Sequence, residues 1–410
     1  MISKTSHSLN IRGIIERQAI ETHFQPITSI RRKQIVGIEA LSRGVDENHQ
    51  LIPPAELFKS AAAEKLSLEL DYVCRTKALE NFLPLHKAMP ELILFMNVHH
   101  AAFDLDGNNK GGLIAQVERF NFDPRNLAVE ILESEFDDVA ALRASIARYK
   151  QQGFLVALDD VGTGHSNLDR VTYIKPDIMK VDASLIQNIH LDYYKQEVFK
   201  SLVNLSEKIG GWIITEGVEE QAEAIVALEL GGDFLQGFYL ARPEKSDGEN
   251  INCAWERVEE TATKFKSHTL DKAKATQPER QTRARLAQEI GGQLKKFAAD
   301  DFPRFLADIV KHYPLIESAC VLNEAGVQIT DTILNETKSQ KQKSIIFRPP
   351  VKGTDHSLKE YYYVLRGAQI DPFETQPYVP LPSGDLCITV STEFKDAAAR
   401  EFILCLHTKV

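Results

Sequence analysis

The stretch FLVALDD at residues 154–160 closes a short apolar run with acidic residues, and in three other stretches an acidic residue likewise closes such a run. They are IVGIEAL at 35–41, LAVEILE at 127–133 and WIITEGVEE at 212–220. Short apolar runs of this kind indicate buried strands. In a (β/α) barrel the carboxyl ends of the strands meet at one mouth, so separate segments can build one active site there. The repeated pattern therefore predicts a barrel whose acidic side chains converge on one mouth.

Strand-like and helix-like runs alternate up to about residue 245. Runs at 23–30 and 34–43, around a short polar stretch, predict an antiparallel hairpin. Six more strands are predicted in crossover order, at 92–98, 127–133, 154–159, 177–182, 212–216 and 234–240. Helical patterns lie between them, including 54–63 and 68–83. Because polar residues end nearly every strand, a TIM-like (β/α)8 barrel fits the pattern better than an open sheet.

The composition sets outer limits on the function. A chain of 410 residues is too long for one ordinary domain. Its net charge of −10 argues against binding of polymeric nucleic acid, which needs a basic face. Five cysteines without CxxC spacing are expected to be reduced and mostly buried. The polar start, and apolar stretches that all fall well short of about 20 residues, predict a cytoplasmic protein without a membrane span.

The character of the sequence changes after the predicted barrel, which covers 1–250. Residues 251–300 are rich in charge and predict a helical connector. The apolar residues that recur there at helical spacing are Leu286, Ile290, Leu294 and Phe297. Residues 301–410 predict a smaller α+β domain with an antiparallel sheet, which begins with a helix near 302–312. Its strands are predicted within 319–330, 361–369, 378–394 and 400–408.

The polar residues at the barrel mouth predict a metal site. Glu39, Asn97, Glu130 and Asp159 offer only oxygen ligands, which Mg²⁺ and Mn²⁺ prefer, whereas zinc prefers histidine or cysteine. Asp160 beside Asp159 is placed to hold a second ion, with Asp159 as the bridge. Two metals about 3.5–4 Å apart can activate water and stabilise the leaving oxygen in phosphoryl displacement.

Two further residues complete the predicted chemistry. Lys180, in the strand-like run DIMKVD, brings a compact cation into the mouth, where it can orient water or offset negative charge. Glu216 is the candidate general base, with a pKa set by neighbouring acids and metals. A salt bridge or a helix cap would explain any one of these acids. It does not explain the whole set in this order.

The chain resembles the EAL-domain phosphodiesterases of cyclic di-GMP, named for the motif that stands here as Glu39-Ala40-Leu41. The resemblance covers roughly residues 15–245 and rests on eight blocks in the family's order. They are FQPI (24–27), EALSR (39–43), MNV (96–98), VEILES (129–134), DDVGTGHSNL (159–168), IKPDIMKVD (174–182), EGVEEQ (216–221) and LQGFYLARP (235–243). The resemblance implies a (β/α)8 barrel with one antiparallel strand, and hydrolysis of cyclic di-GMP to linear pGpG.

By this resemblance, the first metal would be held by Glu39, Asn97, Glu130 and Asp159, and the second by Asp159 and Asp160. Lys180 would contact the water or the metal cluster, and Glu216 would be the general base or a metal-linked acid. The residues that would contact the dinucleotide, line the wall or carry the water network are Gln25, Arg43, Glu219 and Gln236. Glu133 corresponds to the acid that tethers the active-site loop.

The chain departs from the common pattern near the acid pair, where Val161 and His165 replace aromatic residues. These changes bear on the rate and on loop coupling more than on the chemistry. Phe234 and Phe238 are expected in the core. The alternative function is a catalytically silent receptor of cyclic di-GMP, but such receptors usually lack a metal ligand and this chain has the full set.

The C-terminal domain weakly resembles PAS-like or Cache-like modules. A packing or dimerisation domain without a ligand is an equal alternative. Because family members commonly dimerise through the barrel, the resemblance predicts a homodimer whose C-terminal domain adjusts barrel activity.

Overall fold

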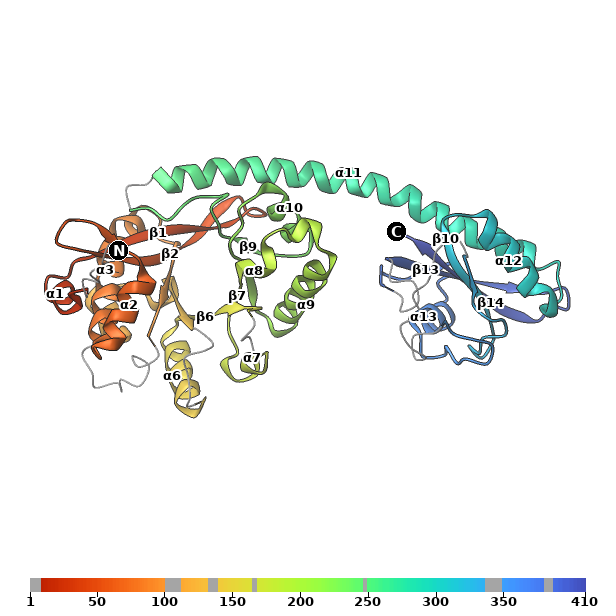
Figure 1. Cartoon of the computed structure of the whole chain (residues 1–410), viewed down its shortest axis with the longest axis horizontal. Helices are drawn as coiled ribbons and strands as arrows, with labels where there is room; N and C mark the ends of the chain where they lie inside the picture. The colour runs from red at the N-terminus through yellow and green to blue at the C-terminus, as the bar shows by residue number, and fades with distance from the viewer. Residues whose placement is uncertain are drawn as a thin grey trace, which may run out of the picture. The chain divides into compact units, whose positions relative to one another are not determined.

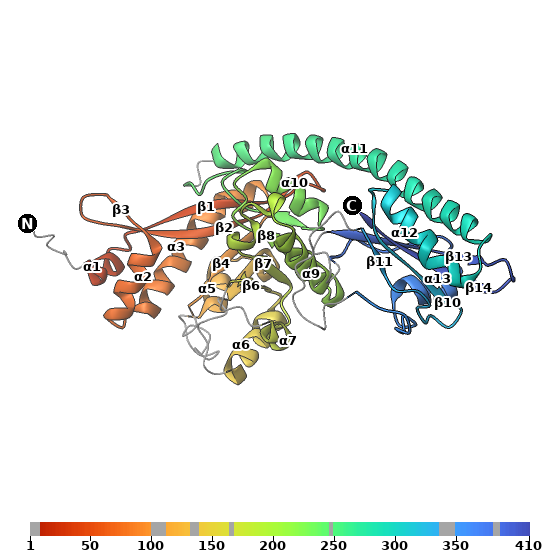
Figure 2. The same cartoon turned by 45° about the vertical axis from the view of Figure 1, so that its right-hand side comes forward.

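The computed structural model describes residues 9–99, 112–131, 139–163, 168–245, 249–335, 349–379 and 386–410. The chain divides into two compact units, Met1–Thr269 and Leu270–Val410. Figures 1 and 2 show strands inside the first unit with helices around them. Within the described ranges, no helix combines the length and the apolar character that a bilayer crossing requires.

The first unit is a closed barrel of eight strands with one short extra strand. The strands are β1 (Ile20–Ser29), β2 (Gln34–Val45), β3 (Leu51–Ile52), β4 (Ile93–Asn97), β5 (Leu127–Ile131), β6 (Leu155–Val161), β7 (Ile178–Val181), β8 (Trp212–Thr215) and β9 (Phe234–Leu235). Their order is β1-β9-β8-β7-β6-β5-β4-β2-β3, and pairing of β1 with β2 closes the ring. β1 is antiparallel to both neighbours, whereas β2 and β4 through β9 pair in parallel. The predicted barrel with one antiparallel strand is confirmed.

Local sequence signals place the barrel helices. Asp192 accepts hydrogen bonds from the backbone N–H groups of Tyr194 and Lys195 at the start of α9, and Gly210 ends that helix with a φ of +77°. Gly153, with a φ of +97°, follows α6 in the same way. The helices of this unit are α1 (Ile11–Glu16), α2 (Pro54–Ala63), α3 (Ser67–Ala88), α5 (Leu113–Arg119), α6 (Val139–Gln152), α7 (Asp169–Ile174), α8 (Ala183–Ile186), α9 (Tyr193–Ile209) and α10 (Gln221–Glu229), with short 3-10 turns at Pro124–Asn126 and Ile189–Leu191.

A layer of apolar side chains fills the inside of the barrel. Seven strands contribute to it, through Ile27, Phe95, Ala128, Ala157, Ile178, Ile214 and Phe234, all buried. A second and larger cluster lies between the strands and the surrounding helices. The barrel interior is therefore a packed core and not a pore, which places the polar residues of the strand ends above a solid apolar floor.

The boundary between the two units falls within α11 (Glu249–Leu294), a single helix that continues through Gly291 and Gly292. The second unit has a five-stranded antiparallel sheet in the order β11-β10-β14-β13-β12. Its strands are β10 (Ile316–Asn323), β11 (Ile333–Leu334), β12 (Phe373–Glu374), β13 (Cys387–Lys395) and β14 (Glu401–Lys409), and its helices are α12 (Phe302–His312), α13 (Glu360–Ala368) and a 3-10 turn at Ala299–Asp301. The C-terminal part of α11 packs with α12 against this sheet through Leu286, Ile290 and Leu294.

Two predictions for the second unit were wrong in detail. The run 361–369 forms helix α13 and not a strand. Tyr361 and Leu365 lie one helical turn apart and pack against the same buried cluster, so their spacing suits a helix. After β10, the predicted return strand is reduced to isolated bridges, between Leu322 and Gln328 and between Val327 and Asp355. The strand predicted within 378–394 is present as β13. All five cysteines are free, and only Cys253 is exposed.

Candidate metal and catalytic site

The ammonium group of Lys180 occupies the centre of the barrel mouth. Lys180 is the third residue of β7, and its side chain is only 1% exposed. Its Nζ atom faces carboxylates from four other segments of the barrel. These are Glu130 at 2.6 Å, Glu216 at 2.7 Å, Asp159 at 3.2 Å and Glu39 at 3.5 Å. The fold thus brings together acids that the sequence predicted at separate strand ends.

Two amide side chains connect these carboxylates to the rest of the mouth. Asn97, the last residue of β4, donates from Nδ2 to Glu130 at 2.8 Å and to Glu39 at 3.3 Å. Gln236, directly after β9, donates from Nε2 to Glu39 at 2.6 Å and to Gln25 at 3.2 Å. Glu39 therefore accepts hydrogen bonds from both amides, which fix its two oxygens.

Asp159 and Asp160 both reach the mouth because β6 is irregular there. In a regular strand, adjacent side chains point to opposite faces. The register between β6 and β7 shifts between Leu158 and Val161, and Asp160 has a left-handed φ of +55°. As a result, ligand oxygens of Asp159, Asp160 and Glu216 lie within 4.8 Å of one another. This trio could hold a metal ion.

The crowding of carboxylates shifts their protonation. Burial, together with neighbouring acids, raises the pKa of Glu130 well above its usual range and that of Glu216 to about 8. Burial and the nearby Asp159 raise the pKa of Asp160 to about 6. Burial acts to lower the pKa of Lys180, but the surrounding carboxylates raise it well above the usual value. One ammonium group does not balance this negative charge, so the cluster favours further cations.

A pocket of about 220 Å³ opens beside the cluster, and Gln25, Glu39, Glu216, Glu219 and Gln236 line it. The backbone N–H of Glu219 donates to Glu223 at 2.9 Å, which holds this wall in place. Arg43, in β2, lies outside the lining, and its Nη1 donates to the carbonyl of Ser42. Burial lowers the pKa of Arg43. Glu133 and His165 lie outside the described residues.

Phe238 is a lining residue that the sequence pattern assigned wrongly to the core. Its side chain is 48% exposed, and the guanidinium of Arg242 lies 4.4 Å from its ring centroid. β9 ends at Leu235, so strand alternation no longer applies at position 238. At Gly237, a Cβ atom would lie only 2.1 Å from the carbonyl oxygen of Val218. The glycine therefore allows the close turn that presents Phe238 at the pocket. Phe234, in contrast, is buried as expected.

Comparisons with known proteins identify the family and the fold of the chain. The model of the EAL domain matches residues 9–243. The chain is 25% identical over 383 residues to the uncharacterized EAL-domain containing protein YkuI of Bacillus subtilis, with 91% of each chain covered. The crystal structure of that protein, in complex with substrate c-di-GMP and calcium, matches with a TM-score of 0.80, 23% identity and full coverage of both chains.

A phosphodiesterase structure matches the barrel alone. The c-di-GMP complex of the MucR phosphodiesterase of Pseudomonas aeruginosa superposes with a TM-score of 0.53 and 25% identity. The match covers 57% of this chain and 96% of that structure. In the sequence comparison, the match covers 34% of the length of the complete MucR protein, which is a bifunctional diguanylate cyclase and cyclic di-GMP phosphodiesterase.

Proposed function

This chain belongs to the EAL-domain family, and from this premise we propose that it hydrolyses cyclic di-GMP to linear pGpG with two divalent metal ions. The observation that carries the proposal is the cluster in which Lys180 faces four carboxylates at the barrel mouth. The MucR structure adds support, because it is a phosphodiesterase in complex with c-di-GMP.

The residues at the mouth suit hard divalent ions such as Mg²⁺ or Mn²⁺. All their ligand atoms are oxygens, from carboxylates and one amide. The residues that would hold the first ion are Glu39, Asn97, Glu130 and Asp159. Asp159 and Asp160 would hold the second, with Glu216 in reach. When bound, such ions stabilise charge on the phosphoryl oxygens and make water a better nucleophile.

Glu216 would act as the general base that takes the proton from the attacking water. Its side chain is only 18% exposed, and partial burial raises its pKa to about 8 in the metal-free protein, so the carboxylate binds a proton strongly. Lys180 would orient Glu216 through the 2.7 Å contact and offset negative charge. Water adds to phosphorus and loses a proton to Glu216, the bond from phosphorus to the 3′ oxygen breaks, the 3′ oxygen takes up a proton from solvent, and pGpG results.

The substrate would lie in the pocket beside the cluster. Gln25 and Gln236 would contact the dinucleotide there, since both line the pocket. Arg43 would approach a phosphate after its side chain leaves the carbonyl of Ser42. The exposed ring of Phe238 offers a surface on which a guanine base can stack. Glu133 would tether the active-site loop.

The test is incubation of the purified protein with cyclic di-GMP and Mn²⁺, followed by chromatography of the products. Formation of pGpG that depends on the metal and is lost in Glu216→Gln is the expected result. Tight binding without product would instead assign the chain as a silent receptor.

We also propose that the protein is a cytoplasmic homodimer whose unit Leu270–Val410 adjusts turnover, in the manner of PAS-like or Cache-like modules. The support for this is a second compact unit with its own core of seventeen buried side chains.

A further inference from the structure

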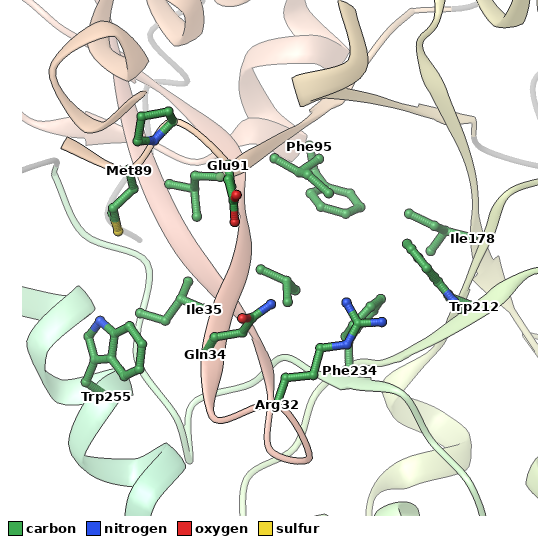
Figure 3. Close-up of a pocket in the computed structure, with 14 residues that line it drawn as sticks. Arg32, Gln34, Ile35, Met89, Glu91, Phe95, Ile178, Trp212, Phe234 and Trp255 are labelled. Atoms are coloured by element: carbon green, nitrogen blue, oxygen red, sulfur yellow. The ribbon is translucent and has the colours of Figure 1, made fainter. Parts of the chain in front are cut away.

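A second pocket, of about 570 Å³, lies at the other end of the barrel from the carboxylate cluster. Figure 3 shows the residues that line it. Five strands line it with their first residues, which are Gln34, Ile93, Ile178, Trp212 and Phe234. The strands that contribute these residues run parallel, so their first residues gather opposite the mouth. The apolar layer inside the barrel forms the floor through Phe95, Ile178 and Phe234. The pocket is thus separate from the proposed site of hydrolysis.

The walls of this pocket are largely aromatic and apolar. Trp212 and Trp255, the only two tryptophans of the chain, stand on opposite sides of it and are 40% and 38% exposed. Trp212 contacts Phe234 edge-on, with ring centroids 5.5 Å apart. Met89 lies on the side of Trp255 (Figure 3), and Pro90 also lines the pocket. Ligand pockets typically combine such apolar walls with a few polar groups that fix the orientation of the ligand.

Three polar side chains reach this pocket, and each has a different chemistry. Figure 3 shows Arg32, Gln34 and Glu91 between the two tryptophans, with Arg32 on the side of Trp212. The guanidinium of Arg32 lies 5.7 Å from the ring centroid of Trp212. Among the residues that the structure describes, neither Arg32 nor Glu91 forms an ion pair. The pocket therefore presents one cation, one amide and one anion on an apolar surface.

We propose that this pocket binds a short peptide with free ends and apolar or aromatic side chains. Glu91 would bind the terminal ammonium group, Arg32 the terminal carboxylate, and Gln34 the amide between them. The side chains of the peptide would pack on the two tryptophans. A ligand with one charge would pair with only one of these two exposed groups, and an uncharged ligand would pair with neither.

The chain supplies its own probe for this binding, because both tryptophans lie at the pocket. Leucyl-phenylalanine, which contains no tryptophan, is titrated into the full chain without metal or cyclic di-GMP. Tryptophan emission is followed. A saturable change is expected, and Trp212→Phe and Trp255→Phe should each remove part of it. The absence of a saturable change in a folded protein at millimolar peptide overturns the proposal.

Matched pairs of variants and peptides test the charges. Glu91→Gln should weaken the binding of leucyl-phenylalanine about tenfold or more, and Arg32→Gln should weaken it to a similar extent. The N-acetylated peptide should bind Glu91→Gln and the natural protein equally, because the ammonium is already absent. The peptide with a C-terminal amide should bind Arg32→Gln and the natural protein equally, because its carboxylate is already absent. Glu256→Gln, an exposed acid outside the pocket, is the control and should bind normally. Equal binding of all three peptides to all variants overturns the assignment.

This outcome is independent of hydrolysis. Glu216→Gln should bind leucyl-phenylalanine normally, since Glu216 lies at the opposite end of the barrel. Failure of the peptide experiment leaves the phosphodiesterase proposal standing, and an inactive protein leaves the pocket proposal standing.

Discussion

The Nζ atom of Lys180 lies 2.7 Å from a carboxylate oxygen of Glu216; the Lys180 side chain is 1% exposed and that of Glu216 is 18% exposed. The Nζ atom of Lys180 also lies 2.6 Å from a carboxylate oxygen of Glu130, so Lys180 forms ion pairs with both acids. The pair belongs to a cluster with a shared charge balance, in which a change in one group alters the protonation of the others. This relationship underlies the first three predictions.

Glu216→Gln should reduce turnover of cyclic di-GMP by about 10²–10⁴-fold while substrate binding is retained, because the amide keeps the shape but cannot take a proton. Initial rates with Mn²⁺ and equilibrium binding with Ca²⁺ measure the two effects separately. Calcium suits the binding assay because its looser coordination is expected not to support the reaction. A rate within a few-fold of the natural protein would remove Glu216 from the role of base.

Lys180→Met should destabilise the metal-free protein by about 3–5 kcal/mol, because it leaves buried carboxylates without their cation. Addition of Mn²⁺ should recover much of this loss. Denaturant unfolding with EDTA and with Mn²⁺ gives the comparison. Lys245→Met is the matched control, since Lys245 is 62% exposed in its pair with Glu21 and should change stability by about 1 kcal/mol or less. Similar losses in the two variants would contradict the prediction.

Stability should depend on pH differently without and with metal. The folded-state pKa values of about 6 for Asp160 and about 8 for Glu216 exceed the unfolded values near 4. From about pH 4 to 8 the folded metal-free chain therefore binds more protons than the unfolded chain, so its stability falls as pH rises. Metal binding releases these protons and strengthens over the same range. Thermal unfolding with EDTA and with Mn²⁺ should show a gap that widens with pH, and a constant gap would refute this.

Phe238→Ala should raise KM for cyclic di-GMP about 5–100-fold with little change in kcat, because loss of one base stack costs about 1–3 kcal/mol. Phe238→Tyr keeps the aromatic face and should behave like the natural protein. Steady-state kinetics distinguish the two parameters. A fall in kcat at unchanged KM would mean that Phe238 acts on the cluster and not on the base.

To remove the second unit, the chain should be truncated after Thr269 and not near residue 250. The start of α11 completes the barrel core through Ile251, Ala254 and Val258, which are at most 8% exposed. A chain that ends at 250 should therefore unfold at lower denaturant concentration than one that ends at Thr269. If the longer truncation is dimeric with unchanged turnover, regulation by the second unit is excluded.

The sequence could predict the barrel because its strands carry apolar runs and end in polar residues. Glu39, Glu130, Asp159 and Glu216 each follow such a run, so their convergence follows from the fold itself. The position of Phe238 could not be predicted in this way, because it depends on a turn at Gly237 against the backbone of Val218.

The second unit was harder to predict because its signals are short. A run such as YYYVLRGAQ favours a strand by residue type, yet packing of Tyr361 and Leu365 on one face selects a helix. The pocket opposite the mouth gave no sequence signal at all, since its residues begin five separate strands.

The irregularity in β6 has a consequence for how many ions such a barrel can hold. A strand of regular alternation would send one of two consecutive aspartates outward, toward the helices. Here the left-handed backbone conformation of Asp160 turns both aspartate side chains inward. A chain with a regular strand here would keep both aspartates of the motif and still lose the proposed second metal site. The number of ions that the proposed site can hold thus depends on the backbone conformation at Asp160, which the sequence motif does not specify.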